Sequence, residues 1–507
     1  MKATRKDIVQ DLENCQQQLA GCNTKQRAWQ RRQRITRFIS DLDENRLYVT
    51  SSVTDVADTF DSTLTLGPRD GPYGMQQLET WYKRNPGFTS PLLTDREIKL
   101  GVRPEDVKNG DLPYRNIGFQ TEVGSVSQPE LLSLERFLSV EALAAYPDCN
   151  ENRTFGGSVH EDWTYYKYLP FTDDDNVDHI CQFLHPPNII DSFAKSNRRR
   201  MESLEDFNWA AQFVQYLQYK HLVEGYSYKM WEWYSAVFLW KTSSPAYTFR
   251  GALYDSNLAT NGGYWGVRAG LAGGQPVRLI LNLYDWTMHI INAISRDISP
   301  LLVEYSALSL KGVLLAKGNI STPVLISGNT VAHLDNSLPW VGGRNLTISS
   351  VVLYRLDLSY SSQGITKSTS NNYFLTDPSL RYSDKAHSRF AFLGAVRKER
   401  VADLAVRCSI DLDLECTIHN GDDFVAIMVK LSIVRPLGNF STGIDRRILP
   451  SFYSDNYFTL LPGETTIVHI TVDDNIVASC TTILVDIDGW NIRKNSVEVA
   501  CDSVASS

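Results

Sequence analysis

A carboxylate with small and polar neighbours stands where a predicted strand ends. Glu122 follows the strand expected over Asn116–Gln120, and Thr121, Gly124 and Ser125 flank it. Burying a charged carboxylate is costly, so this residue is a candidate for a chemical role. In the retaining mechanism of glycoside hydrolysis, one carboxylate attacks the anomeric carbon. A second carboxyl group about 5–5.5 Å away protonates the leaving oxygen and later activates water. The alternatives, in which Glu122 caps the following helix or pairs with an arginine, stay open.

Flat aromatic side chains could supply a sugar-binding surface near this carboxylate. Trp240 ends the next buried strand, predicted over Ser235–Trp240, and a ring at such a position can form the floor under a sugar. Tyr73, Trp163 and Tyr165 are weaker candidates of the same kind. Core packing is the alternative for each of these rings.

The sequence contains no pattern typical of a metal or cofactor site. The 9 His are scattered and the 8 Cys form no C-x-x-C pair, so no zinc site is predicted. The acidic run 173–175 with Asp178 lacks the spacing of an EF-hand, and no phosphate-binding glycine loop or dinucleotide fingerprint occurs. We therefore expect neither a metal nor a cofactor.

Composition and charge exclude several classes of protein. The 507 residues carry 50 Lys+Arg and 58 Asp+Glu, and the net charge of −8 argues against a nucleic-acid binder. No apolar run of about 18 residues occurs, so no membrane-spanning helix is expected. The first residues do not form a secretory signal. With 43% hydrophobic and 21% charged residues, the chain should fold, and its length suits about two to four domains.

Sequons and cysteines bear on the cellular location. Asn-X-Ser/Thr sequons give weak support for the secretory pathway, a lysosome or vacuole, or the extracellular space. The candidate glycosylation sites are Asn152, Asn319, Asn345 and Asn439. Cys408 and Cys416 could bridge neighbouring strands, but the sequence leaves this open.

The first half of the chain alternates strands with helices. The clearest helix is expected over residues 204–224, where apolar residues recur on one side, and another helix should follow Pro129. Apolar strands alternating with helices indicate a parallel α/β sheet or barrel. Glu122 and Trp240 would then lie at carboxyl ends of strands, where a (β/α)8 barrel places its active site.

The second half, from about residue 277, loses helical periodicity. Short apolar or alternating runs separated by Gly, Asn, Asp and Ser are typical of β-sandwiches, and ~230 residues suit two of them. A junction between the two is expected at the charged run 397–400. The expected strands include Val277–Leu283, Leu301–Leu310, Ile348–Leu356, Val425–Ile433 and Thr466–Val472.

A set of short strings runs along most of the chain in a distinctive order. The first half holds Asp70–Tyr73, Gly118–Val126, Trp163–Tyr168, Phe238–Thr242 and Arg250–Asp255. The second half holds Arg447–Pro450, Tyr453–Phe458 and Leu461–Glu464. Together these strings resemble glycoside hydrolase family 2, in particular its β-mannosidase and exo-β-glucosaminidase branch. Within that branch they are most similar to the C-terminal portion of the mannosylglycoprotein endo-β-mannosidases.

The resemblance implies a mechanism and a set of site residues. Glu122 would be the nucleophile of a retaining glycosidase that acts, without metal or cofactor, on β-linked mannosides of N-glycan-type or related oligosaccharides. Trp240 would form the platform of the sugar subsite, with Trp163 and Tyr73 as further substrate-binding candidates. Exo-β-glucosaminidase-type specificity is an alternative.

The resemblance also implies a multidomain fold class. Residues 1–270 would form the C-terminal half of a (β/α)8 TIM barrel that serves as the catalytic domain. Two immunoglobulin-like β-sandwiches would follow, the first over 271–398 and the C-terminal one over 399–507.

The chain departs from the family pattern upstream of the nucleophile. Family members carry a sugar-binding jelly roll, an immunoglobulin-like domain and the first barrel half there, with the acid/base Glu in an Asn-Glu motif. No such motif precedes residue 46, and Asn150-Glu151 follows the nucleophile. We therefore expect this chain to supply the nucleophile half of the site. The rest of the barrel would be carried either by a longer form of the same chain or by an N-terminal chain as a partner. The alternative is a catalytically inactive protein that binds carbohydrate or another partner.

Overall fold

The fold is that of a computed structural model of the 507-residue chain. The structure describes residues 78–82, 119–125, 127–146, 160–166, 203–232, 234–249, 252–342, 351–375, 401–410, 413–436, 446–472 and 482–501. Tyr73 lies outside these ranges, as does the dipeptide Asn150-Glu151.

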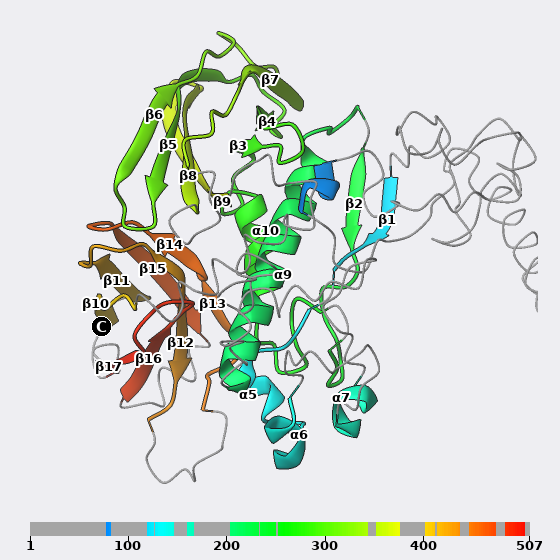
Figure 1. Ribbon diagram of the computed structural model, residues 1–507, viewed down its shortest axis with the longest axis vertical. Coiled ribbons are helices and arrows are strands. Elements are labelled where there is room, and N and C mark those ends of the chain that lie inside the picture. Colours follow the sequence, from blue (N-terminus) through cyan, green and yellow to red (C-terminus); the bar gives the residue numbers. More distant parts are fainter. Residues whose placement is uncertain are drawn as a thin grey trace, which may run out of the picture.

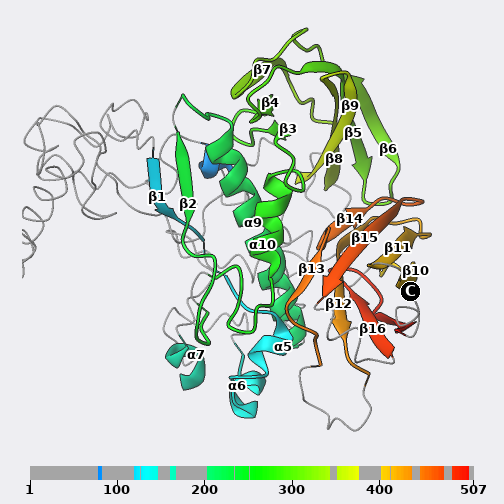
Figure 2. The same ribbon diagram turned by 180° about the vertical axis from the view of Figure 1, so that it is seen from behind.

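The first group of elements combines helices with a pair of strands. The group comprises η2 (Leu78–Tyr82), β1 (Phe119–Val123), α5 (Leu131–Leu134), α6 (Val140–Ala144), α7 (Glu161–Tyr165), α9 (Leu204–Ser227), β2 (Ala236–Leu239) and α10 (Gly262–Gly270). Strands β1 and β2 pair in parallel. In Figures 1 and 2, α9 runs through the middle of the molecule, with β1 and β2 on one side and the β-rich half on the other.

Helix α9 confirms the helix expected over 204–224 and continues to Ser227. The side chain of Ser203 caps its first turn by accepting a hydrogen bond from the backbone N–H of Asp206. The helix is buried on almost every side because it packs against η2, α10 and strands of the β-rich half. It is therefore the central helix, against which η2, α5 and α10 pack.

Helix α10 was not expected, because its sequence is rich in glycine, a weak helix former. The packing explains these glycines. A Cβ atom on Gly262 would lie 2.1 Å from the carbonyl oxygen of Gln212, and one on Gly266 would lie 2.2 Å from that of Tyr216. Glycine at this spacing lets the backbones of α9 and α10 approach each other closely.

The second group of elements forms two antiparallel sheets between residues 277 and 375. One sheet has the order β3-β4-β7 and the other the order β6-β5-β8-β9. The strands are β3 (Val277–Leu281), β4 (Thr287–Asn292), β5 (Ser299–Ser309), β6 (Leu314–Asn319), β7 (Thr330–Ser337), β8 (Val352–Ser362) and β9 (Ile365–Leu375).

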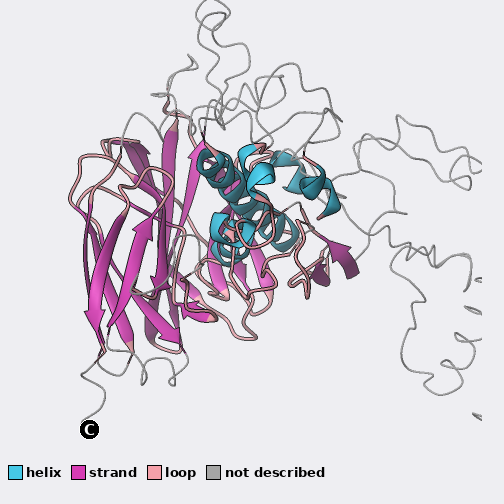
Figure 3. Cartoon of the chain, turned by 90° about the horizontal axis from the view of Figure 1, so that it is seen from below, coloured by secondary structure: helices cyan, strands magenta, loops and turns pink. Residues whose placement is uncertain are grey.

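The third group forms two further sheets between residues 404 and 500. Their orders are β10-β11-β15-β13 and β14-β12-β16-β17, and Figure 3 shows the strands of the β-rich half from below. The strands are β10 (Leu404–Ile410), β11 (Leu414–Asn420), β12 (Ala426–Val434), β13 (Ser451–Tyr453), β14 (Phe458–Leu460), β15 (Thr465–Val472), β16 (Thr482–Asp488) and β17 (Asn495–Ala500). Every strand named above for the second half of the sequence is present, with ends shifted by a few residues.

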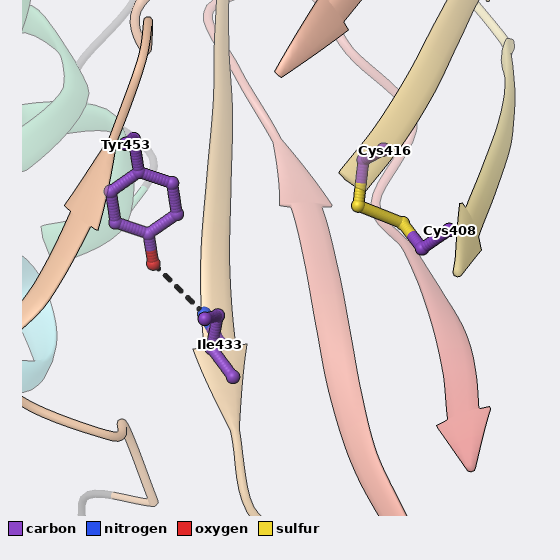
Figure 4. Close-up of a disulfide and its surroundings, with 4 residues drawn as sticks. All are labelled: Cys408, Cys416, Ile433 and Tyr453. Atoms are coloured by element: carbon purple, nitrogen blue, oxygen red, sulfur yellow. Dashed lines mark hydrogen bonds between the residues drawn. A yellow bond between two sulfur atoms is a disulfide. The ribbon is translucent and has the colours of Figure 1, made fainter. Parts of the chain in front are cut away.

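The disulfide that the sequence left open joins β10 to β11. Cys408 and Cys416 stand opposite each other in this antiparallel pair, with Cα atoms 4.1 Å apart, and their sulfur atoms are bonded. Figure 4 shows the bridge, together with the hydroxyl of Tyr453, which accepts a hydrogen bond from the backbone N–H of Ile433 at 3.1 Å. Cys501 is also disulfide-bonded.

Strand β2 corrects one expectation from the sequence. The run Ser235–Trp240 was expected to form a fully buried strand, but the side chain of Phe238 is 54% exposed. The other residues of β2 are half-buried. An apolar run alone cannot show which of its faces is covered.

A buried carboxylate ties α9 to the first pair of sheets. Glu224 pairs with Lys220, one turn earlier on the helix, at 2.6 Å. It also accepts hydrogen bonds from Tyr82 of η2 at 2.7 Å and from Asn371 and Tyr373 of β9 at 2.8 and 3.0 Å. The carboxylate therefore joins three elements that are far apart in the sequence.

A second buried carboxylate ties the helical part to the C-terminal sheets. Glu130, just before α5, pairs with Arg447 at 2.8 Å and with Lys430 of β12 at 2.7 Å. It also accepts a hydrogen bond from the hydroxyl of Tyr457 at 2.6 Å. The guanidinium of Arg447 donates to Ser133 as well, at 2.7 Å.

Candidate active site

Strand β1 is irregular at the point that carries Glu122. The register shifts between the pairs Gln120–Val237 and Val123–Leu239, so that two residues of β1, one of them Glu122, lie opposite a single residue of β2. Such bulges redirect a side chain and are frequent next to active sites. The carbonyl oxygen of Glu122 accepts a hydrogen bond from the side chain of Gln120 at 2.7 Å, which supports the bulge from within the strand.

Trp240 lies at the corresponding end of β2. Its backbone N–H donates a hydrogen bond of 2.8 Å to the carbonyl oxygen of Val123, which extends the parallel pairing beyond the last residue of the strand. Its ring is 44% exposed, and its peptide bond to Lys241 is cis. Glu122 and Trp240 are thus brought to the ends of two neighbouring parallel strands, as the sequence predicted, although Glu122 lies within β1 and not after a strand that ends at Gln120.

Gly124 allows these two strand ends to touch. A Cβ atom at this position would lie 2.1 Å from the carbonyl oxygen of Trp240, which is far inside contact distance. The same Cβ would lie 3.6 Å from the hydroxyl of Tyr219 on α9. A residue with a Cβ atom at this position would therefore clash with the backbone of Trp240, whereas glycine does not.

Trp163, another of the predicted aromatic candidates, is buried away from solvent. Trp163 has no exposed surface: its ring stacks on Phe249 at 4.9 Å, and its indole N–H donates to the carbonyl oxygen of Ala142 at 2.9 Å. A ring without an exposed face cannot stack on a sugar, so we assign Trp163 to the core. Tyr165 is 75% exposed, and Tyr73 lies outside the described residues.

Tyr247 is an exposed ring that the sequence analysis did not single out. It lies in the segment that follows β2, is 40% exposed, and stacks on Phe137 at 5.1 Å with nearly parallel planes. Its place shortly after Trp240 is the only signal in the sequence that could have suggested a role.

Tyr219 of α9 is a second residue that the sequence analysis missed. Its hydroxyl donates to the carbonyl oxygen of Ser125 at 2.8 Å and accepts from the N–H of Ser125 at 3.2 Å. Burial raises the pKa of Tyr219 to about 12, so the hydroxyl keeps its proton at neutral pH. A tyrosine within a helix gives no sign in the sequence that its hydroxyl bonds the backbone of a distant segment.

Three further features concern the described residues: metal ligands, membrane-spanning helices and sequons. Within the described ranges, no three His, Cys, Asp or Glu residues are grouped so that they could hold a metal ion. No helix in that part of the chain is long and apolar enough to cross a membrane. Asn319 is exposed at the end of β6, whereas Asn152, Asn345 and Asn439 lie outside the described residues.

Comparison with known proteins gives one family model and two relatives of note. The model of the exo-β-D-glucosaminidase Ig-fold domain matches residues 385–492. A mannosylglycoprotein endo-β-mannosidase from Lilium longiflorum is 26% identical over 447 residues, which cover 78% of this chain and 44% of the lily protein.

The second relative is a solved structure. The crystal structure of an exo-chitosanase from Amycolatopsis orientalis superposes with a TM-score of 0.58 at 18% identity, over 85% of this chain and 46% of that one. At this identity the likeness bears on the fold alone. The chain spans less than half the length of both relatives.

Proposed function

Because the chain resembles the C-terminal portion of family 2 glycoside hydrolases of the β-mannosidase and exo-β-glucosaminidase branch, we propose that it carries the nucleophile half of a retaining β-glycosidase site. Glu122 is the nucleophile in this proposal, and Trp240 is the platform under the sugar. The observation that carries the proposal is the bulge that bears Glu122 beside the exposed ring of Trp240.

The chemistry follows from these two side chains. A carboxylate oxygen of Glu122 attacks the anomeric carbon of a β-linked sugar, and the bond to the leaving oxygen breaks with its electron pair. The ring of Trp240 packs against the apolar face of that sugar and fixes its position. Water then hydrolyses the glycosyl-enzyme ester with net retention of configuration.

The second carboxyl group of the mechanism is part of the same proposal. In the family pattern it belongs to the first barrel half, upstream of the nucleophile. We propose that β1 and β2 are strands of an incomplete (β/α)8 barrel over residues 1–270, and that an N-terminal barrel half supplies the acid/base carboxyl. The parallel pairing of β1 with β2, and the positions of β3 and β10, support the domain limits at 271 and 399.

The substrate class is proposed as β-linked mannosides of N-glycan-type or related oligosaccharides. The relative from lily, which covers most of this chain, supports mannose. A specificity for β-glucosaminides is the second candidate, and the match of the exo-β-D-glucosaminidase Ig-fold domain supports it. The disulfide between Cys408 and Cys416 supports an oxidising compartment such as the secretory pathway.

The proposal can be tested with a reagent that needs no general acid. In 2,4-dinitrophenyl 2-deoxy-2-fluoro-β-mannoside, the leaving group departs as a stable anion without protonation, and the fluorine slows hydrolysis of the ester. The full chain should release close to one equivalent of dinitrophenolate in a burst. Glu122→Gln should release none, whereas Glu141→Gln, which changes an exposed carboxylate on α6, should behave as the wild type.

Two other results would change the proposal. A faster burst from the corresponding 2-fluoro-glucoside than from the mannoside would favour the second specificity. If neither reagent gives a burst, but mannosides quench the tryptophan fluorescence of the wild type and not that of Trp240→Phe, the chain is a carbohydrate-binding protein and not half of an enzyme.

A further inference from the structure

One face of α9 carries polar side chains although it is buried. Asn208, Gln212, Gln215 and Tyr219 follow one another at steps of four, three and four residues, so they lie on the same side of the helix. Their exposed fractions are 5%, 1%, 0% and 0%, respectively. Amides and hydroxyls are costly to bury unless each one is hydrogen-bonded, so this polar face requires partners.

The partners are backbone groups of the segment that follows Glu122. The amide of Asn208 donates to the carbonyl oxygen of Pro129 at 3.0 Å, and that of Gln212 donates to the same oxygen at 3.2 Å. Gln215 makes a reciprocal pair with Gln128: it accepts from the N–H at 3.0 Å and donates to the carbonyl oxygen at 3.1 Å.

Tyr219 repeats this reciprocal pattern at the end nearest to Glu122. Its hydroxyl donates to the carbonyl oxygen of Ser125 and accepts from the N–H of the same residue. Side chains of a helix thus satisfy the backbone of an extended segment in the way that a neighbouring strand would do. We call these four residues of α9 the polar ladder.

The ladder acts at the position that matters for Glu122. The chain from Glu122 to Ser125 passes Gly124, where an added Cβ would meet the carbonyl oxygen of Trp240 at 2.1 Å and the hydroxyl of Tyr219 at 3.6 Å. A shift of Ser125 away from α9 would therefore move Gly124 relative to Trp240, and with it the bulge that aims Glu122. A nucleophile must be held to within a fraction of an ångström for efficient attack.

We infer that the polar ladder of α9 is a positioning device for the nucleophile, with Tyr219 and Gln215 as its main positioning residues. The inference rests on the proposed function of Glu122. Neither residue touches the sugar: each acts through the backbone between Gly124 and Gln128. The ladder therefore affects the rate of attack on the anomeric carbon rather than the binding of the sugar.

The test compares substitutions on the same helix. Tyr219→Phe keeps the ring and removes only the hydroxyl, and Gln215→Met removes the reciprocal pair with Gln128. Gln218→Met is the matched control, because Gln218 is equally buried on α9 but accepts a hydrogen bond from the indole of Trp81, outside the ladder. The full chain and the dinitrophenyl 2-fluoro-mannoside described above are used.

Each variant is measured in two ways. The first is the rate of labelling at saturating reagent, together with the reagent concentration that gives half of that rate. The second is hydrogen exchange of the amides of Ser125 and Gln128, which donate to Tyr219 and Gln215, respectively. Both ladder variants should lower the saturating rate by about tenfold, with the half-saturating concentration within about twofold of wild type. Tyr219→Phe should speed exchange at Ser125, and Gln215→Met at Gln128.

The outcomes separate this inference from the proposed function. If the wild type is labelled at Glu122 but the ladder variants react as fast as Gln218→Met, the inference is wrong and the proposed function stands. An equal loss of rate in Gln218→Met, or a change in half-saturation alone, also overturns it. A wild type that is not labelled overturns the proposed function, and the inference with it.

Discussion

At the scale of single residues, the candidate site depends on close backbone contacts between the ends of β1 and β2. Glu122 lies in a bulge, Trp240 pairs with Val123 through its backbone, and Gly124 lies under the carbonyl oxygen of Trp240. The position of the carboxylate is therefore fixed by its neighbours in the chain as much as by its own strand.

Gly124→Ala tests this close approach. The added Cβ would lie 2.1 Å from the carbonyl oxygen of Trp240, a backbone atom that cannot yield without moving the end of β2. We expect a loss of about 1–3 kcal/mol in the free energy of unfolding, measured with urea, and a slower reaction with the 2-fluoro-mannoside.

Gly421→Ala is the control for this substitution. A Cβ there would meet its nearest neighbour, the ring of His419, at 3.7 Å, which is ordinary contact. It should be nearly neutral in both measurements. A Gly124→Ala variant as stable and as reactive as this control would contradict the packing described for the site.

Some of these residues could be predicted from the sequence, and others could not, because the sequence does not show which side chains are buried. The placement of Glu122 and Trp240 at the ends of neighbouring strands could be predicted, because each stands at the end of a segment with strand-like sequence. The prediction of Trp163 as a substrate-binding residue is wrong, because residue type alone does not distinguish a buried ring from an exposed one. Tyr219 and Gln215 could not be found, since polar residues at helical spacing normally indicate a solvated face.

At the scale of elements, α9 holds its neighbours through buried charge as well as apolar packing. Burial alone would raise the pKa of Glu224, but the charge of Lys220 and the hydrogen bond with His221 outweigh it and hold that pKa at about 2. The carboxylate is thus ionised at all ordinary pH values, and its bonds to Tyr82 and Tyr373 join η2 and β9 to the helix.

This pKa predicts how stability depends on pH. A carboxyl group whose pKa is about 2 when folded and 4.5 in the unfolded reference stabilises the fold above pH 4.5 and loses that effect as the pH falls toward 2. Glu224→Gln should lower the free energy of unfolding at pH 7 by about 3–5 kcal/mol, because Lys220 loses its counter-ion.

Urea unfolding between pH 7 and pH 2.5 checks both parts of this prediction. The gap between wild type and Glu224→Gln should be largest near neutrality and should shrink below about pH 4.5. A gap that stays constant over this range would show that the Glu224 carboxyl does not have a lowered pKa.

Elements with strong periodicity could be predicted, and those shaped by tertiary contact could not. Helix α9 and the strands of the β-rich half follow from apolar spacing. Helix α10 was missed because its glycines contradict helix propensity, and only the surface of α9 requires them. The bulge in β1 likewise arises from the pairing of β1 with β2, so the sequence of β1 alone does not reveal it.

At the scale of the whole molecule, buried ion pairs join the C-terminal sheets to the helical part. The junction centres on Glu130, and its partners Arg447 and Lys430 come from the C-terminal group. Burial would raise the pKa of Glu130, but these two cations outweigh it and lower that pKa overall. Glu130 directly follows the backbone segment that the polar ladder holds, so the junction extends the support of that segment.

Arg447→Met tests this junction. It removes a cation whose side chain is only 3% exposed and leaves Glu130 with Lys430 and the hydroxyl of Tyr457. We expect a loss of about 3 kcal/mol in the free energy of unfolding, and an earlier transition for the C-terminal sheets. The urea transition should be followed by total fluorescence and by protection of amides in β12.

The matched control is Arg493→Met. Arg493 pairs with Asp403 at 3.3 Å, but both side chains are largely exposed, at 67% and 61%. An exposed pair of this kind contributes about 0–1 kcal/mol. Equal effects of the two substitutions would mean that Glu130 does not hold the two parts of the molecule together.

The β-rich architecture of the second half of the chain could be predicted, whereas the junctions between the parts of the molecule could not. Alternating runs and turn residues indicate sandwiches, because each strand must bury one face. The sequence does not show that Glu130 meets Arg447, since the two are 317 positions apart and either could be a surface charge.

The central claim is that Glu122 is a glycosidase nucleophile, and the position of the covalent label tests it most directly. The full chain is treated with the dinitrophenyl 2-fluoro-mannoside and digested, and the modified peptide is sequenced by tandem mass spectrometry. We expect a 2-fluoromannosyl ester on Glu122 in the peptide that contains residues 119–125. A label on any other residue would contradict it.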